Sequence, residues 1–158
     1  LVGADIFIGL ACPGLVTGDD IKKMAKDPIV FALSNPDPDI SPEEAKSAGA
    51  KIICTGRSDL GNQVNNLLAF PGIMRGALDS RACVINEAMK VAASMTIANL
   101  LPENELREDR IIIEPFAKGV AQAVAKAVAK AAFETSVART NLTLQEVCDL
   151  IEGRLEGK

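Results

Sequence analysis

The sequence of 158 residues predicts an α/β fold with a doubly wound parallel sheet. Two observations support this prediction. Short apolar segments rich in β-branched residues recur along the first third of the chain and are typical of buried strands. Helix-start signals stand between these segments, so strands and helices alternate as they do in parallel sheets with right-handed crossovers. The hydrophobic content of 48% fits one compact core for a chain of this length.

The first predicted strand runs from Ala4 to Leu10, and its mostly apolar sequence is typical of a strand covered on both faces. The turn-forming residues 11–14 end it. Thr17, with Asp20 three residues later, predicts the N-terminus of the next helix. Asp27-Pro28 then stops that helix before the second strand.

The second predicted strand is Ile29 to Leu33, and the third is Lys51 to Cys54. Between them, residues 41–44 form a helix-start signal with Ser as N-cap, Pro at the first position and Glu at the third. Gly49 is placed to end this helix. Cys54 is expected to be a small core residue of the third strand.

Helices dominate the chain beyond Phe70. One is predicted from about Val84 to Leu100, with an apolar stripe suited to core packing. The segment Phe116 to Phe133 carries a row of valines with alanines between them, which permits close packing against a sheet, another helix or a second copy of the chain. Thr143 and Glu146 predict a final capped helix, and residues 110–113 are a candidate fourth strand.

Each predicted strand is followed by an unusual loop. Small residues from Gly9 to Gly14 would let a ligand approach the backbone closely, so Gly9, Pro13 and Gly14 are candidate cofactor contacts. Two prolines stiffen the loop that holds Asn35. Any one of these loops alone is more often an ordinary turn. Because the carboxyl ends of parallel strands share one edge, the three together favour a binding site there.

The third loop contains a cluster of amides. Asn62, Asn65 and Asn66 are spaced so that they would share one face of a helix. Primary amides are poor core residues, because each brings donors and an acceptor that need partners, so a polar ligand is expected to meet them. The alternative is a solvated helix start with Asn62 as its N-cap.

The run TGRSDLGNQVNNLLAFPGIMRGALD, from Thr55 to Asp79, resembles the cofactor domain of bacterial and archaeal malic enzymes. The similarity extends from about Ala4 to Arg139. Where the family commonly has an aromatic residue and a proline before the amides, this chain has Leu60-Gly61. The resemblance implies a Rossmann-type NAD(P)-binding domain over residues 1–139, followed by a C-terminal helix and tail over residues 140–158.

The resemblance also implies a function. Malic enzymes transfer a hydride from L-malate to NAD or NADP and release CO2 to leave pyruvate, with a divalent metal, Mg or Mn, as a further cofactor. The positions that match the family's site are Asn35 and Asn65 for cofactor and substrate, and Asn66 for substrate, with Asn62 a weaker match. The family's metal ligands and catalytic Lys and Tyr lie in sequence that would precede Leu1, so no catalytic or metal-binding residue is assigned in this chain. The parent enzyme is expected to be a homodimer.

The sequence starts at Leu1 without Met, and it contains no G-x-G-x-x-G motif. Three strands are also fewer than a complete dinucleotide-binding domain has. We therefore expect a fragment that lacks the first β-α-β unit of its domain. The residue that would discriminate NAD from NADP belongs to that unit, so the preference is not predicted.

Composition excludes several classes of protein. The net charge of −4, with no long basic run, argues against a nucleic acid partner or an anionic membrane surface. No apolar stretch approaches the ~20 residues of a membrane span and no signal peptide is evident, so a cytoplasmic location is expected. The four cysteines have no short paired spacing and there is no His, which argues against a zinc site. Without His or Tyr, the isolated chain is predicted not to oxidise malate.

Two other classes stay open at this stage. The chain could be the nucleotide-binding module of another two-domain dehydrogenase, such as an amino-acid dehydrogenase. It could also be a non-catalytic dimerisation domain that uses the alanine- and valine-rich helix. Nucleotide titration would separate the second class from the others.

Overall fold

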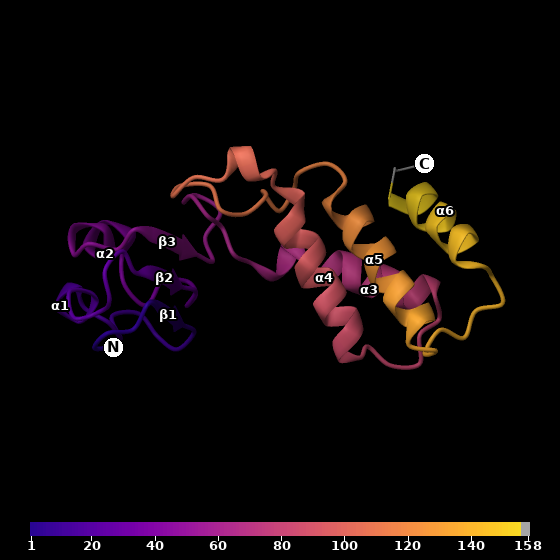
Figure 1. Ribbon diagram of the computed structural model, residues 1–158, viewed down its shortest axis with the longest axis horizontal. Helices are drawn as coiled ribbons and strands as arrows, with labels where there is room; N and C mark the ends of the chain where they lie inside the picture. Colours follow the sequence, from indigo (N-terminus) through magenta and orange to yellow (C-terminus); the bar gives the residue numbers. More distant parts are fainter. Residues whose placement is uncertain (156–158) are drawn as a thin grey trace. The chain divides into compact units, whose positions relative to one another are not determined.

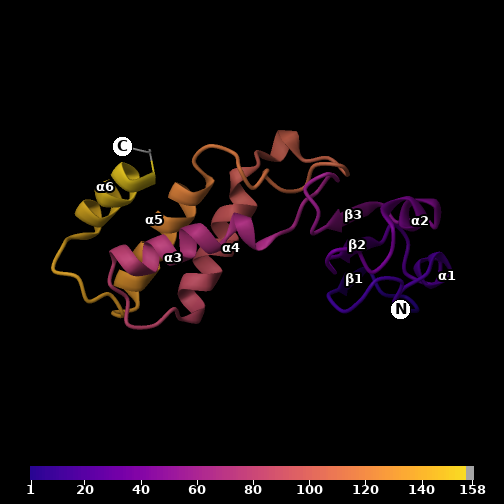
Figure 2. The same ribbon diagram turned by 180° about the vertical axis from the view of Figure 1, so that it is seen from behind.

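The computed structural model describes residues 1–155 and divides the chain into two compact units (Figures 1 and 2). The first, here called the sheet unit, comprises Leu1–Asn65 and Glu103–Ile112. The second, the helical unit, comprises Asn66–Pro102 and Ile113–Lys158. The predicted domain boundary at residue 139 falls inside the helical unit and stays a prediction. The end of the predicted C-terminal tail lies outside the described residues.

The sheet unit is built on three parallel strands, β1 (Ile6–Gly9), β2 (Ile29–Ala32) and β3 (Ile52–Thr55), in the order β1-β2-β3 (Figure 1). Their register places the three last residues, Gly9, Ala32 and Thr55, side by side. Each strand lies within two residues of its predicted bounds. The predicted α/β class with a parallel sheet is confirmed.

The two faces of this sheet differ. On one face Phe7, Val30 and Ile53 pack in a core with residues of α1 (Gly18–Ile21) and α2 (Pro42–Ser47). On the other face, Ile6 is 52% exposed and Ile8 is 62% exposed. The expectation that the first strand is covered on both faces is therefore wrong for this structure, because both crossover helices pack on the same side.

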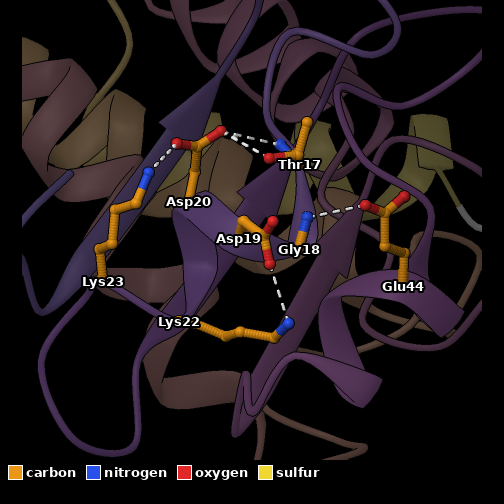
Figure 3. Close-up of polar contacts among 7 residues, drawn as sticks. All are labelled: Thr17, Gly18, Asp19, Asp20, Lys22, Lys23 and Glu44. Carbon is orange, nitrogen blue, oxygen red and sulfur yellow. Dashed lines mark hydrogen bonds and ion pairs between the residues drawn. The ribbon is translucent and has the colours of Figure 1, made fainter.

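Both crossover helices begin as their sequences predict. The Asp20 carboxylate accepts hydrogen bonds from the backbone N–H and the hydroxyl of Thr17, at 3.2 and 2.8 Å (Figure 3). The Ser41 hydroxyl accepts from the backbone N–H of Glu44 at 3.1 Å, with Pro42 at the first position of α2. The Glu44 side chain in turn accepts from the N–H of Gly18 at 2.7 Å, which joins the start of α1 to α2 (Figure 3). The first helix ends at Ile21, well before the predicted stop at Asp27.

The helical unit consists of α3 (Phe70–Asp79), α4 (Glu87–Leu100), α5 (Val120–Glu134) and α6 (Leu144–Leu155) (Figure 1). Helix α5 packs against each of the other three (Figure 2). The valine row of α5, predicted as a candidate dimer seam, packs against other helices of the same chain instead. The buried residues of this row are Val120, Val124 and Val128.

Close approach of α3 and α5 depends on two glycines. A Cβ at Gly72 would lie 2.6 Å from the Cβ of Val124, and one at Gly76 would lie 2.9 Å from the Cβ of Val128 and closer still to the carbonyl oxygen of Ala125. Real Cβ atoms are not found at such distances. Only glycine therefore permits the observed packing.

Two further expectations are corrected. Residues 110–113 form no strand, and Arg110 instead pairs with Arg107 in an isolated bridge. The amide segment is not one helix, since only the short 3-10 turn Asn66–Leu68 forms there, and a second such turn lies at Glu103–Glu105. Pro71 lies in the first turn of α3, where its missing N–H costs nothing. Helix α4 begins after Asn86, whose side chain accepts from the N–H of Met89 at 3.1 Å.

Candidate functional site

The candidate site lies at the carboxyl edge of the sheet. Because Gly9, Ala32 and Thr55 are in register, the loops that follow them leave the sheet next to one another. This is the edge at which open parallel sheets bind ligands. The predicted convergence of the three loops is thus observed within the sheet unit.

One buried carboxylate joins two of these loops. Asp39 has no exposed surface, and its Oδ1 accepts from the backbone N–H of Ala11 at 3.2 Å and from the hydroxyl of Ser34 at 2.8 Å. Its Oδ2 accepts from the backbone N–H of Ser34 at 3.1 Å. Ala11 follows β1 and Ser34 follows β2, so Asp39 fixes the two loops relative to each other.

Although burial alone raises the pKa of the Asp39 carboxyl, the hydrogen bonds from Ser34 and Ala11 outweigh it and hold that pKa below its usual value. These donors are neutral, and Asp39 forms no ion pair with any described residue. Asp39 therefore remains ionised at neutral pH. Sequence analysis missed this residue, because a lone Asp after a Pro-rich turn is usually solvated.

Gly9 accommodates this carboxylate. A Cβ at Gly9 would lie 2.5 Å from Oδ2 and 2.8 Å from Oδ1 of Asp39. The space that Gly9 was predicted to offer a cofactor is thus filled by Asp39. Pro13 and Gly14 lie further along the same loop and are exposed, with Gly14 in the left-handed region at φ 70°.

Two of the predicted amides meet at Gly56, directly after β3. The Nδ2 of Asn65 donates to the carbonyl oxygen of Gly56 at 3.1 Å. The side chain of Asn35 lies against the other side of the same residue, since a Cβ at Gly56 would be 3.2 Å from its Nδ2. Gln63 also donates to the Gly56 carbonyl, at 3.4 Å. Asn35 and Asn65 are therefore brought together, as the sequence predicts, although not on a helix.

Arg57 links the loops after β2 and β3. Its guanidinium donates two hydrogen bonds to Asp59, at 2.9 and 2.7 Å, and forms an ion pair with Asp37 at 3.8 Å. The hydrogen bond and the charge of Asp59 raise the pKa of Arg57. Sequence analysis quoted Arg57 within its motif and assigned it no role.

Asn62 has a structural role rather than a place among the site amides. Its Nδ2 donates to the carbonyl oxygens of Ile53 at 3.1 Å and Glu108 at 2.8 Å, and its Oδ1 accepts from the N–H of Ile111 at 2.8 Å. It is buried and in the left-handed region at φ 51°. Both sequence interpretations, a shared face with Asn65 and Asn66 and an N-cap, are wrong for Asn62. Asn66 is exposed and begins the helical unit.

A cavity of about 580 Å³ lies elsewhere in the sheet unit, beside β3. Its charged lining is mixed, with Lys46, Lys51 and Arg107 facing Glu108 and Asp109. Of the residues that the sequence matched to the family's site, only Asn62, the weaker match, lines it among the described residues. The burial of Cys54, which raises the pKa of its thiol to about 12, confirms the prediction that it is a core residue.

Residues 1–155 contain neither a metal-ligand cluster nor a membrane-spanning helix. In that part of the chain no three His, Cys, Asp or Glu side chains come together in a way that could hold a metal ion. The same residues include no helix both long and apolar enough to cross a membrane. A metal therefore finds no set of ligands in the described chain.

A parallel α/β sheet with polar loops gathered at its carboxyl edge defines a nucleotide-binding type of domain. The family model described as "Malic enzyme, NAD binding domain" matches residues 1–133, and the chain belongs to this family. The interpretation as a module of an amino-acid dehydrogenase is therefore wrong.

Relatives and solved structures agree with this assignment. A bifunctional malic/malolactic enzyme from Bacillus subtilis strain 168 is 58% identical over 94% of this chain and 36% of its own length. An NAD-dependent malic enzyme from Geobacillus stearothermophilus is 52% identical, over 88% of this chain and 29% of its own length. The crystal structure of a malic enzyme from Pyrococcus horikoshii has a TM-score of 0.88 and 46% identity, over 97% of this chain and 35% of that one. The chain thus spans 29 to 36% of the length of these proteins.

Proposed function

We propose that this chain forms the cofactor-binding part of an NAD(P)-dependent malic enzyme, which oxidises and decarboxylates L-malate to pyruvate and CO2. Family membership supports the assignment, as do relatives named NAD-dependent and NADP-dependent malic enzymes. The nicotinamide cofactor would accept the hydride from malate. The alternative of a non-catalytic dimerisation domain loses its support, because the helix invoked for it is buried within the chain.

The meeting of Asn35 and Asn65 at Gly56 is the observation that favours this function. Primary amides offer both donors and an acceptor, which suits the carboxamide of nicotinamide and the carboxylates of malate. We propose that Asn35 and Asn65 contact both ligands and that Asn66 contacts the substrate. Gly9, Pro13 and Gly14 shape the cofactor side of the loop after β1.

The remaining features of the enzyme are also part of the proposal. The cofactor domain covers residues 1–139, and the chain works within a cytoplasmic homodimer. Because the described residues offer no set of metal ligands, the divalent metal, Mg or Mn, would be held by other parts of the full-length enzyme. No step of the chemistry assigned to this chain depends on it.

Substituting Asn66 with Ala in the full-length enzyme tests the proposal. A hydrogen bond from a neutral amide to a neutral or charged partner contributes ~0.5 to 3 kcal/mol, so kcat/KM for malate should fall by about 2- to 150-fold. Because Asn66 is exposed, the melting temperature should change little. Steady-state kinetics and thermal unfolding measure the two effects.

Asn99, which is exposed on α4, is the matched control, and Asn99→Ala should leave both quantities unchanged. An Asn66→Ala enzyme that unfolds earlier but keeps its kinetics would show a purely structural amide. A wild-type enzyme without activity on malate would overturn the proposed function itself.

A further inference from the structure

We propose that Asp39 is a positioning residue of the site: its buried carboxylate sets the place of Asn35 by tying the loop after β2 to the loop after β1. The role rests on the proposed function, since Asn35 is the ligand contact that it serves. Asp39 is assigned a positioning role because its carboxylate is fully buried and both of its oxygens accept hydrogen bonds from the two loops.

The hydrogen bonds reach the residue next to Asn35. Ser34 immediately precedes Asn35, and both of its donors, the N–H at 3.1 Å and the hydroxyl at 2.8 Å, are directed at Asp39. Among residues 1–155 the Asn35 side chain forms one hydrogen bond, a long one of 3.5 Å to the carbonyl of Leu33. The amide of Asn35 is thus held mainly through its own backbone, which Asp39 anchors.

The loop after β1 is held by the same group. Ala11 donates its N–H to Oδ1 at 3.2 Å, and the backbone carbonyl of Asp39 accepts from Val16 at 3.4 Å. One residue therefore holds both ends of the Pro13-Gly14 loop and the start of the Asn35 loop. Displacing the carboxylate would release both loops together.

Gly9 and Asp39 act as a pair. The carboxylate fills the volume that any side chain at position 9 would need, with Oδ1 only 2.8 Å from a Cβ built there. Gly9→Ala should therefore act by pushing the Asp39 carboxylate away from Ala11 and Ser34. When Asp39 has already been shortened to Ala, the same methyl group has room.

The chemistry also favours a carboxylate over an amide. Three donors converge on the two oxygens of Asp39, and an ionised carboxylate can accept all of them. Asn has the same size but must place its NH2 group against at least one of these donors. Asp39→Asn should accordingly keep part of the function, and Asp39→Ala should lose more.

The test is a double-mutant cycle in the full-length enzyme with Gly9→Ala, Asp39→Ala and the combination of the two, together with Asp39→Asn. We measure kcat and KM for malate and for NAD(P) well below the melting temperature, and thermal unfolding in parallel. Misplacement of a ligand contact by about 1 Å costs on the order of 100-fold, which is the loss of kcat/KM expected for Asp39→Ala. Asp39→Asn should lose roughly 10-fold, since it keeps part of the hydrogen bonding.

The cycle separates positioning from mere stability. If Gly9 acts through Asp39, the double variant should resemble Asp39→Ala, so the two effects are not additive. Asp19→Asn, which removes an exposed carboxylate paired with Lys22 on α1, should leave kcat and KM unchanged.

Additive effects, or Asp39 variants that melt earlier with unchanged kcat and KM, would overturn the positioning role and leave the proposed function standing. If Asp39→Ala does not fold, Asp39→Asn and Gly9→Ala decide the question by the same kinetics. A wild-type enzyme that does not oxidise malate would overturn both proposals.

Discussion

In the described residues the sheet unit buries four polar side chains. The helical unit buries two, and its helices pack closely through alanine and glycine. The buried polar residues of the sheet unit are Ser34, Asp39, Thr55 and Asn62. Each of them holds a loop or a distant segment in place through side-chain hydrogen bonds. Specific hydrogen bonds thus shape the edge where the site lies, and steric fit shapes the helices.

Two buried aspartates illustrate the difference. Asp39 in the sheet unit is held by neutral N–H and O–H donors from two loops. Asp79 in the helical unit is 1% exposed and is paired with Arg154 of α6 and, at 3.3 Å, with Arg75 of α3. Neutral donors from the loops hold Asp39, whereas the long side chain of Arg154 joins α6 to α3 and Arg75 pairs with Asp79 within α3. Substitutions should therefore affect the units in different ways.

The largest effect is expected from Asn62→Asp in the sheet unit. The change replaces the NH2 group, which donates both hydrogen bonds, with an oxygen that would face the carbonyls of Ile53 and Glu108. Leaving buried carbonyls unpaired beside a buried charge should cost about 3 to 5 kcal/mol in the free energy of unfolding. Urea denaturation followed by circular dichroism measures this change in the free energy of unfolding. Asn99→Asp on the exposed face of α4 is the control, and similar losses for both would contradict the role of Asn62.

A smaller loss of stability is expected in the helical unit, and its control variant should gain stability. Gly76→Ala would force a methyl group against Val128 and the carbonyl of Ala125, so overpacking should cost about 1 to 3 kcal/mol. Gly153→Ala in α6 meets no atom within 4 Å and should stabilise by roughly 0.5 to 1 kcal/mol through helix propensity. If steric fit governs the packing of α3 against α5, thermal unfolding should show a lower melting temperature for Gly76→Ala and a higher one for Gly153→Ala. Equal increases in the melting temperature of both variants would show that α3 and α5 can move apart without a loss of stability.

The smallest effect is a pH dependence in the sheet unit. The folded-state pKa of Asp39 lies below its unfolded value, so its stabilisation is complete above about pH 4, the unfolded pKa, and is lost as the pH falls through the folded pKa. Asp39→Asn cannot titrate. The difference in stability between wild type and Asp39→Asn should therefore shrink between pH 7 and pH 3, as urea midpoints at the two pH values would show. A constant difference would mean that the charge of Asp39 does not contribute.

Local sequence signals predicted those parts of the fold that local interactions determine. The strands match within two residues because their apolar runs are short and bounded by turns, and the helix starts at Ser41 and Thr143 match because the capping groups lie three residues apart. Asn35 and Asn65 converge because the strands before them are in register.

The remaining features depend on partners far away in the chain. The amide of Asn62 meets residues 46 and 49 positions further on, so nothing nearby in the sequence distinguishes it from its neighbours. Asp39 takes one donor from a residue 28 positions earlier, and its burial follows from that contact. The close packing of α3 could have been predicted from the sequence, because the four-residue spacing of Gly72 and Gly76 often marks close helix packing.

The hydrogen bonds of Asn62 also set an order of events during synthesis. The chain leaves the sheet unit after Asn65 and returns to it only at Glu103, so two partners of Asn62, Glu108 and Ile111, are translated after all of α3 and α4. At ribosomal speeds of about 5 to 20 residues per second, the 49 residues between Asn62 and Ile111 correspond to roughly 2 to 10 seconds. Throughout that interval the side chain of Asn62 lacks two of its three hydrogen-bond partners, the carbonyl of Glu108 and the N–H of Ile111.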